Sequence, residues 1–312
     1  MKILAIVVLY YPDQRVKENM LSYAGQVDRL IVWDNTPSAD ARPALRFDET
    51  TERKIVRMGT GKNAGIGTAL NEAVRYGLAG GYTHLLTMDQ DSRFGEGMAA
   101  AFFRSVAALA PAGEPDAASM QPSPQPAEAA AATPAPCLPA AGRNIASYSA
   151  ATRPYAPGTP ETEEIEWAIT SGTLYRLPVF EETGLFRDDF FIDAIDTEFG
   201  FRLRKHGWKM IRMNRIYLYH ELGRVTETPF LWGKLVTPNY PAQRTYYLVR
   251  NTLALRRLYP GYRQSEGLMR MLFFWRPVCI LCVETDKWRK FKAIFCGIVH
   301  AWRGKRGEYR LR

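Results

Sequence analysis

The chain has 312 residues, of which 46% are hydrophobic, 12% aromatic and 23% charged. This is the composition of a soluble globular protein, and it excludes a chain disordered throughout, a collagen-like repeat and a small disulfide-stapled fold. Four cysteines are too few and too irregularly spaced for a disulfide framework: Cys137, Cys279, Cys282 and Cys296. The apolar N-terminus, MKILAIVVLYYPD, lacks the small-residue cleavage site of a secretory signal. We therefore expect a cytoplasmic protein with reduced cysteines.

The net charge of +9 is distributed unevenly along the chain. Residues 200–312 contain 24 Lys and Arg against 6 Asp and Glu, a net of +18, whereas residues 1–199 have a net of −9. Concentrated positive charge attracts phosphorylated substrates, nucleic acid or anionic lipid, although a merely solvated basic face is the alternative. Because no RNP, zinc-finger or helix-turn-helix pattern is present, nucleic acid is not expected as a partner.

The first ninety residues alternate between strand and helix patterns. Lys2–Tyr10 is a continuous apolar, β-branched run, typical of a strand buried on both faces of a parallel sheet. Further strands are predicted at Leu30–Trp33, Ile55–Met58 and His84–Met88, with helices at Val16–Val27 and from Ile66 to a stop near Gly77–Gly81. This alternation predicts an open α/β sheet with right-handed crossovers, whose ligands bind beyond the carboxyl ends of the strands.

The middle of the chain is less regular. Residues 107–164 are rich in Ala, Pro and Ser, which predicts an irregular excursion with one possible short strand, ASMQP at residues 118–122. A strand signal returns over residues 166–177. Residues 186–207 are strand-like as far as Ile192 and then helical, and Arg215–His220 is a further predicted strand.

Asp89, Gln90 and Asp91 form the sharpest short motif, directly after a predicted strand. Two carboxylates separated by one residue at a strand end can hold a divalent ion against diphosphate oxygens. His220 ends another predicted strand. A lone histidine is more often structural, so it becomes a candidate ligand only if it meets Asp91 in space.

The glycine-rich segment Gly59–Gly67 is not a P-loop, because Lys62 is followed by Asn63 where Ser or Thr should hold magnesium. It also lacks the spacing and the position of a dinucleotide fingerprint, which argues against a nicotinamide enzyme. It predicts a tight loop before a helix N-terminus, where backbone N–H groups can contact a nucleotide.

A second acidic group comprises Asp193, Asp196 and Glu198. On a helix, residues two apart point in roughly opposite directions, so Asp196 and Glu198 cannot share one face. One carboxylate can face a cleft while another, such as Asp193, caps the helix or is solvated. The CxxC pair Cys279 and Cys282 has no second pair, and buried apolar cysteines are its simplest interpretation.

Seven motifs occur in a fixed order: VVLYYP, IVWDNTP, GKNAGIGTALNEA, LLTMDQDS, ITSGTLY, GLFRDDFFIDAIDTEFGFRLRKHG and LYHELG. Together they resemble the inverting family 2 glycosyltransferases of the GT-A fold. The segments FFID…DTE, RTYYLVRN and GIVHAWRGKRGEYR resemble the rhamnosyltransferase branch. The resemblance covers residues 1–92 and 165–310. It implies a GT-A domain at 1–230, a Rossmann-like open mixed sheet flanked by helices, and a C-terminal helical, basic extension at 231–312.

The resemblance also implies roles for single residues. The expected donor-binding residues are Val8, Tyr10, Asp34, Asn63, Asp89 and Gln90. Asp91 and His220 are expected to hold Mg²⁺ or Mn²⁺, and Asp196 is expected to be the catalytic base. The turn Ser171–Gly172–Thr173 is expected to line the acceptor side.

The implied reaction moves L-rhamnose from dTDP-rhamnose, with inversion, to a hydroxyl of a bacterial surface glycan that can be lipid-linked. The alternatives are a UDP-hexose donor on the same fold and a non-catalytic nucleotide- or nucleic-acid-binding protein.

The basic C-terminal third suggests a membrane partner. The apolar run Leu268–Glu284 is broken by Arg270, Arg276 and Pro277, and it is too short to span a bilayer. It predicts an interfacial element with aromatic anchors and basic contacts to anionic lipid at the inner face of the membrane. The expected contacts are Trp275, Trp288, Trp302, Lys287, Arg289, Lys290 and Lys292. A buried helix pair or a homodimer interface is the alternative.

Overall fold

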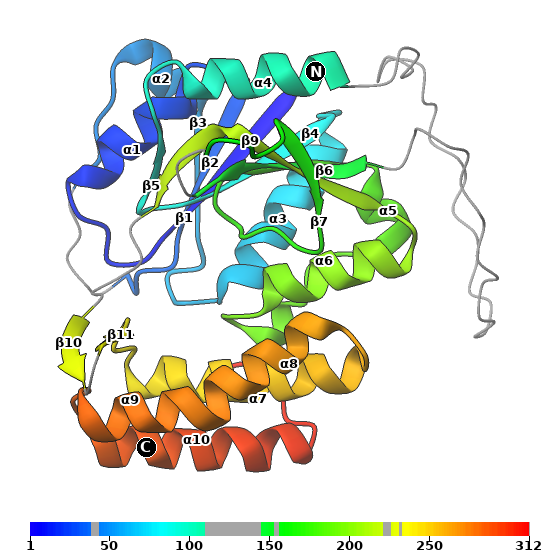
Figure 1. Cartoon of the computed structure of the whole chain (residues 1–312). Helices are drawn as coiled ribbons and strands as arrows, with labels where there is room; N and C mark the ends of the chain where they lie inside the picture. Colours follow the sequence, from blue (N-terminus) through cyan, green and yellow to red (C-terminus); the bar gives the residue numbers. More distant parts are fainter. Residues whose placement is uncertain (39–43, 110–144, 153–155, 221–225, 231–232, 312) are drawn as a thin grey trace, which may run out of the picture. The chain divides into compact units, whose positions relative to one another are not determined.

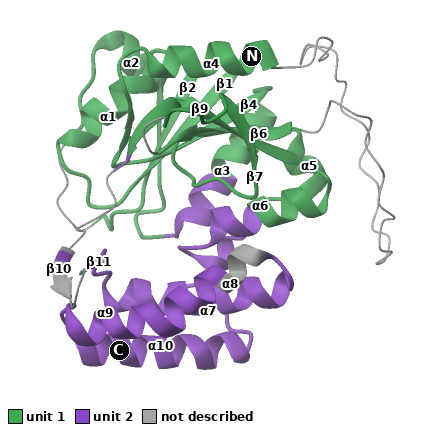
Figure 2. Ribbon diagram, in the orientation of Figure 1, with its two compact units in different colours: residues 1–63, 72–185, 200–219 green, residues 64–71, 186–199, 220–312 purple. Residues whose placement is uncertain are grey.

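Figure 1 shows a computed structural model of the chain, which describes residues 1–38, 44–109, 145–152, 156–220, 226–230 and 233–311. The chain divides into two compact units (Figure 2). The sheet unit comprises residues 1–63, 72–185 and 200–219, and the helical unit comprises residues 64–71, 186–199 and 220–312. The helical unit thus includes three segments of the stretch 1–230, which was expected to form a single domain: residues 64–71, 186–199 and 220–230.

The sheet unit is built on one mixed nine-stranded sheet with the order β3-β2-β1-β4-β8-β6-β9-β5, and β7 also pairs with β9. The first five strands are β1 Ile3–Leu9, β2 Arg29–Asp34, β3 Ile55–Met58, β4 His84–Asp89 and β5 Ser92–Phe94. The others are β6 Ile145–Ala151, β7 Thr162–Ile165, β8 Thr173–Arg176 and β9 Lys209–His220. Strands β1 to β4 are parallel, whereas β8 runs antiparallel to β4 and β6.

Helices cover the sheet, as expected for an α/β fold. They are α1 Arg15–Ala24, α2 Glu49–Lys54, α3 Ile66–Ala79, α4 Met98–Leu109, α5 Val179–Thr183 and α6 Ile195–Lys205. The predicted apolar face of α1 belongs to the main core, whose buried residues include Met20 and Tyr23 of α1 with Ala5 and Val7 of β1. Helix α3 also packs closely on β1, since a Cβ added at Gly77 of α3 would lie 3.3 Å from the side chain of Leu4. The expected open mixed sheet flanked by helices is confirmed.

The prediction of an irregular path over residues 107–164 is wrong for most of its described parts, although residues 156–161 are irregular as expected. Helix α4 continues to Leu109, and residues 145–151 and 162–165 form β6 and β7. Composition concealed β6, which lies between β8 and β9, because its Ala and Ser side chains are small, although all of them are buried. The possible strand at residues 118–122 lies outside the described residues.

Two further predictions need correction. In the predicted strand 166–177 only Thr173–Arg176 is a strand, because the chain turns at Gly172, whose φ is +71°. The strand-like stretch before Ile192 forms instead a 3₁₀ turn, η2 Asp188–Phe190, and α6 begins at Ile195. The phenylalanines of the stretch before Ile192 gave it a strand-like pattern. In the structure they pack against other side chains and do not alternate along a strand.

The helical unit contains a hairpin, β10 Thr226–Phe230 and β11 Gly233–Thr237, followed by helices. The helices are α7 Ala242–Leu258, α8 Arg263–Arg270, a π-helical turn η3 Met271–Trp275, α9 Arg276–Cys282 and α10 Lys287–Trp302. Helices α7 and α10 pack so closely that a Cβ at Gly297 would lie 3.0 Å from the carbonyl oxygen of Tyr246. Only glycine fits there without a shift.

A buried ion cluster ties α9 to α10. The carboxylate of Glu284 is fully buried and binds Arg276, while Lys290 Nζ donates to Glu284 Oε2 at 2.7 Å. Lys290 is 2% exposed, so its expected contact with lipid is wrong: its charge is required inside the fold. Cys279 is buried as expected, but Cys282 is exposed, and Cys137 lies outside the described residues.

Candidate functional site

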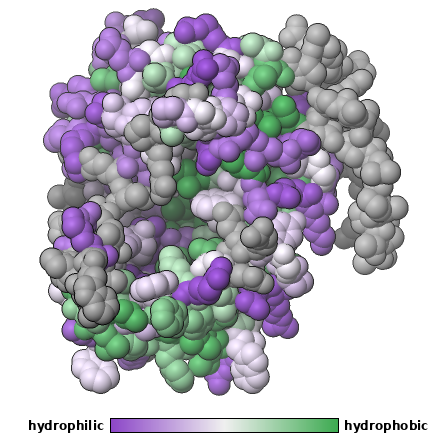
Figure 3. Space-filling view, viewed as in Figure 1, coloured by the Kyte–Doolittle hydropathy of each residue, from purple (hydrophilic) through white to green (hydrophobic). Residues whose placement is uncertain are grey.

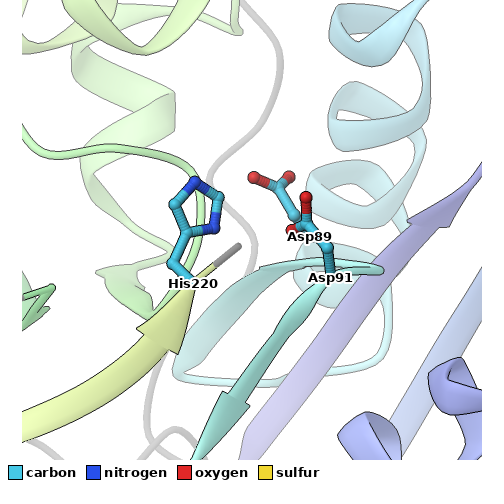
Figure 4. Close-up of side chains that lie close together, drawn as sticks. All are labelled: Asp89, Asp91 and His220. Carbon is cyan, nitrogen blue, oxygen red and sulfur yellow. The ribbon is translucent and has the colours of Figure 1, made fainter. Parts of the chain in front are cut away.

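The acidic motif and the predicted histidine come together at the strand ends of the sheet. Asp89 ends β4, Asp91 precedes β5, and β5 pairs with β9, whose last residue is His220. One ligand atom from each of the three side chains lies within 4.8 Å of the other two (Figure 4). All three are partly exposed, so they can receive an ion from solution.

Two buried serines support the carboxylates. Ser171 Oγ donates to Asp89 Oδ2 at 2.6 Å, and Ser92 Oγ lies 3.0 Å from Ser171 Oγ and 3.2 Å from Asp91 Oδ1. Both serines are 0% exposed. Hydrogen bonds of this kind fix the orientation of carboxylates that bind a metal. Sequence reasoning missed Ser92 entirely, although it directly follows the acidic motif.

The predicted acceptor turn therefore has a visible structural use. Gly172 N–H donates to Thr87 O at 2.9 Å, and Thr173 Oγ1 donates to Ile169 O at 2.7 Å. Thr173, like Ser171, is 0% exposed, so these two side chains serve the fold and the carboxylates. The acceptor contact expected of this turn stays a prediction.

Gln90 joins the acidic motif to the end of β1. Its amide exchanges two hydrogen bonds with the backbone of Tyr10, accepting from the N–H at 2.8 Å and donating to the carbonyl at 3.2 Å. The side chain of Asn19 donates to the carbonyl of Gln90 at 2.8 Å. The ring of Tyr10 is left 48% exposed, where an aromatic face is available for stacking. Gln90 thus positions the end of β1, while its expected donor contact stays a prediction.

A pocket of about 700 Å³ lies at the carboxyl ends of β1, β2 and β3. Its lining includes Leu9, Asp34, Ser38, Phe47, Arg57 and Gly59. A volume of this order accommodates a small organic ligand. The pocket adjoins the acidic motif, because Leu9 follows Val8, which is paired in register with Asp89.

Two local features shape the pocket. The backbone N–H of Thr36 donates to Asp34 Oδ1 at 2.8 Å, which turns the chain after β2. A Cβ at Gly59 would lie 2.6 Å from the carbonyl oxygen of Asp34, so the close approach of these strand ends requires glycine. Among the predicted donor residues, Asp34 lines the described pocket, whereas Val8 and Asn63, both partly buried, do not.

The second acidic group lies in the helical unit, where its members have different surroundings. Asp196, in the first turn of α6, is partly exposed and accepts from the N–H of Thr197 at 2.7 Å. Glu198 is 2% exposed and accepts from the hydroxyl of Tyr259 at 2.7 Å. The expected separation of Asp196 from Glu198 is therefore present. Of the two, Asp196 is the one whose carboxylate solvent can reach.

Asp193 does not cap α6, because the helix begins two residues later. Its Oδ1 accepts from Arg244 Nη2 at 3.1 Å, and its side chain is 10% exposed. Within the described part of the chain, its Oδ2 is buried without a hydrogen-bond partner. Burial raises the pKa of Asp193, and the guanidinium of Arg244 partly opposes this effect.

No protein-family model and no curated protein sequence matches the chain. Solved structures match it along nearly its whole length. The crystal structure of S. aureus TarS residues 1–349 in complex with UDP-GlcNAc has a TM-score of 0.53 and 14% identity, covering 96% of this chain and 81% of that one. GalNAc-T7 with UDP, GalNAc and Mn²⁺ has a TM-score of 0.52 and 8% identity, covering 94% of this chain and 54% of that one. This chain spans 49% of the longer TarS structure.

At these identities the structural matches show the fold alone. The chain has the GT-A glycosyltransferase fold, as the sequence motifs led us to expect.

Proposed function

We propose that the protein is an inverting glycosyltransferase that moves a sugar from a nucleotide-sugar donor to an acceptor hydroxyl. The observation that carries this proposal is the group Asp89, Asp91 and His220, which lies at the strand ends of a GT-A sheet beside a pocket large enough for a nucleoside. The titles of the similar structures name UDP-GlcNAc for TarS, and UDP, GalNAc and Mn²⁺ for GalNAc-T7. Sugar nucleotides are thus ligands of this fold.

The three side chains suit Mg²⁺ or Mn²⁺. Carboxylate oxygens suit both ions, and the imidazole of His220 favours a transition metal such as Mn²⁺ over Mg²⁺. A bound ion would neutralise the charge that develops on the departing diphosphate. The buried serines would hold the two carboxylates in place for it.

Asp196 is proposed as the base that takes the acceptor proton while the hydroxyl attacks the anomeric carbon. The bond from the acceptor oxygen to the anomeric carbon forms as the bond to the diphosphate breaks, and a single displacement inverts the configuration. The family resemblance selects Asp196, and its partial exposure is consistent with that role.

The proposed donor is dTDP-rhamnose, and this choice rests on the resemblance of FFIDAIDTE and RTYYLVRN. The test is a panel of nucleotide sugars that includes dTDP-rhamnose and UDP-GlcNAc, scored for Mn²⁺-dependent protection from thermal unfolding and for release of the nucleoside diphosphate. A donor at 100 times its Kd stabilises the fold by about 2.7 kcal/mol, which is readily measured. We expect the largest shift and the fastest release with dTDP-rhamnose.

The UDP-GlcNAc bound to TarS makes a UDP-hexose the second candidate. Comparable turnover with a UDP-sugar would contradict the rhamnose assignment and leave sugar transfer intact. Protection by nucleotides without release from any donor would contradict transfer itself and favour a non-catalytic nucleotide-binding protein.

The acceptor is proposed to be a surface glycan presented at a membrane, because the helical unit exposes a stripe suited to a lipid surface. Among the described residues, no helix is both long and apolar enough to cross a bilayer. On α10 the side chains of Trp288, Phe295 and Trp302 recur every seven residues and are 87%, 67% and 82% exposed. Figure 3 shows hydrophobic residues gathered over α9 and α10.

Basic residues flank this aromatic stripe. Lys287, Arg289, Lys292 and Arg303 are exposed on or beside α10, within the segment that has a net charge of +18. Exposed aromatic side chains beside Lys and Arg are typical of helices that bind the headgroup region of anionic membranes. We therefore propose peripheral association of the helical unit with an anionic leaflet.

Replacing Trp288, Phe295 and Trp302 together with serine should release the protein from vesicles that contain anionic lipid. The three side chains are largely exposed, so the fold should survive, and sedimentation with phosphatidylglycerol vesicles measures the loss. Leu21→Ser on α1, where the leucine is 43% exposed, is the matched control. Wild-type protein that fails to sediment with anionic vesicles at low salt would contradict membrane association.

A further inference from the structure

The turn that precedes α6 has an unusually strained backbone. Three of the four residues 191–194 have positive φ values although none is glycine. The values are +67° at Phe191, +63° at Asp193 and +63° at Ala194. At Phe191 the ψ is −58°, and the N–H of Ile192 donates back to the carbonyl of Phe190 at 2.8 Å, which makes a strained γ-turn. Such conformations persist only where the surroundings hold them.

Asn251 of α7 is the residue that gathers this turn. Its amide nitrogen lies 2.9, 2.7 and 3.0 Å from the carbonyl oxygens of Phe190, Ile192 and Asp193. Arg250 holds Asn251 in turn, because its Nε donates to Asn251 Oδ1 at 2.9 Å and its Nη2 donates to Phe190 O at 2.9 Å. Both side chains are 0% exposed.

The C-terminal segment completes the arrangement. Gly307 N–H donates to Asp189 O at 2.7 Å, and Gly307 O accepts from Arg250 Nη1 at 2.7 Å. Further along, the hydroxyl of Tyr247 donates to Tyr309 O at 3.0 Å, and the ring of Tyr247 stacks on Phe191 with centroids 5.1 Å apart. The motif RTYYLVRN and the basic tail thus act on one short stretch of backbone.

The strained segment 191–194 also determines where α6 begins. The carbonyl of Ala194 accepts the N–H of Glu198 at 2.9 Å, so Asp196 lies in a helical turn whose first backbone bond comes from the strained segment. Every backbone carbonyl from Asp189 to Ala194 accepts a hydrogen bond. The one that Asn251, Arg250, Gly307 and Glu198 do not reach, Phe191 O, accepts from Ile66 N–H at 2.8 Å. A change at Asn251 is therefore transmitted to the backbone that carries Asp196.

We propose that Asn251, held by Arg250 and the C-terminal segment 307–311, is a positioning residue that clamps the strained turn 191–194 and thereby aims the carboxylate of Asp196. Its catalytic part rests on the proposed function. The clamp itself is a statement about the backbone, and it can be measured without any substrate.

The test compares Asn251→Ala with Thr245→Ala in the full chain. Thr245 is a matched control on the same helix, because it is also 0% exposed and its Oγ1 accepts a buried hydrogen bond at 3.0 Å from Arg276 Nη2 rather than from the turn. Amide hydrogen exchange of peptides covering residues 189–199 should accelerate in Asn251→Ala and not in Thr245→Ala. Unchanged exchange in Asn251→Ala overturns the clamp.

Kinetics test the catalytic part. Asn251→Ala should lower kcat by about 10²-fold, the scale expected for a misplaced catalytic group, with the donor KM within about twofold of wild type. The acid limb of its kcat profile should also move, because the surroundings of the base change. Accelerated exchange with wild-type kcat and pH profile overturns the positioning role. If wild-type protein transfers no sugar, the proposed function fails, while the exchange data still decide the clamp.

Two further variants keep the proposal testable if Asn251→Ala does not fold. Removal of residues 307–312 takes away the Gly307 contacts at a chain end, and it should change exchange and kcat in the same direction to a smaller extent. Ala194→Gly should raise Tm in the wild type, because glycine adopts a positive φ without strain. It should raise Tm less in a clamp variant whose turn has relaxed, and equal increments in the two backgrounds overturn the clamp.

Discussion

Asp91→Ala and His220→Ala should each remove metal-dependent turnover, with a loss of at least about 10²-fold, because even the residues that merely support metal ligands are worth 10 to 100-fold. Chelator-treated wild-type protein should lose activity in the same way and regain it with Mn²⁺ or Mg²⁺. Mn²⁺ binding measured by electron paramagnetic resonance gives a readout that needs no substrate. Each ligand variant should bind Mn²⁺ more weakly than wild type.

The serine network predicts a graded series within this experiment. Ser171→Ala leaves all three ligands in place but removes the hydrogen bond to Asp89, so it should weaken Mn²⁺ binding by about 10 to 100-fold, less than loss of a ligand. Glu49→Gln is a suitable control, since Glu49 is 80% exposed in its ion pair with Arg53 on α2. Full activity of Asp91→Ala in the presence of chelator would contradict the assignment of the metal site.

Much of the sheet unit could be predicted because its strands are unambiguous. A run such as Lys2–Tyr10 is apolar throughout, and burial on both faces of a parallel sheet is a common reason for that pattern. Helices α1 and α3 have one apolar face each and were placed to within a few residues, whereas α2, which has no buried residues, was not predicted. Residues 145–151 were missed because Ala and Ser are small enough to fill a central strand without the usual β-branched signal.

The site was predicted only conditionally. Asp89 and Asp91 are separated by a single residue, but His220 joins them through the pairing of β5 with β9, which lie more than a hundred residues apart in the chain. No local pattern specifies that pairing. The contribution of Ser171 has the same origin, because its hydroxyl reaches Asp89 across the neighbouring strand ends.

The helical unit shows where charge and apolarity mislead. Lys290 belongs to a run of basic residues that suggests lipid contact, yet its position on α10 directs it inward to Glu284. The stretch before Ile192 resembles a strand, yet its backbone is held in a strained turn by Asn251. Both outcomes depend on tertiary partners distant in sequence, which a single sequence does not reveal.

Asp196→Asn should reduce turnover by about 10²–10⁴-fold, the usual contribution of general base catalysis. Asparagine keeps the size of the side chain and an acceptor for the N–H of Thr197, but it cannot take a proton from the acceptor hydroxyl. Donor binding should persist, because Asp196 is not one of the proposed metal or donor ligands. Thermal shifts with donor and Mn²⁺ measure that binding separately from turnover.

The neighbouring carboxylates are the matched controls, and they separate the possible bases. Glu198→Gln keeps an acceptor for the hydroxyl of Tyr259 and should remain active. Asp193→Asn also tests the rival base, because burial raises the pKa of Asp193. A base must be deprotonated to act. If Asp193 is the base, turnover would therefore begin to fall at a pH higher than the ordinary pKa of an aspartate as the solution is acidified. If Asp196→Asn stays active while Asp193→Asn is inactive, the base is Asp193, and a product with retained anomeric configuration would contradict single displacement by either residue.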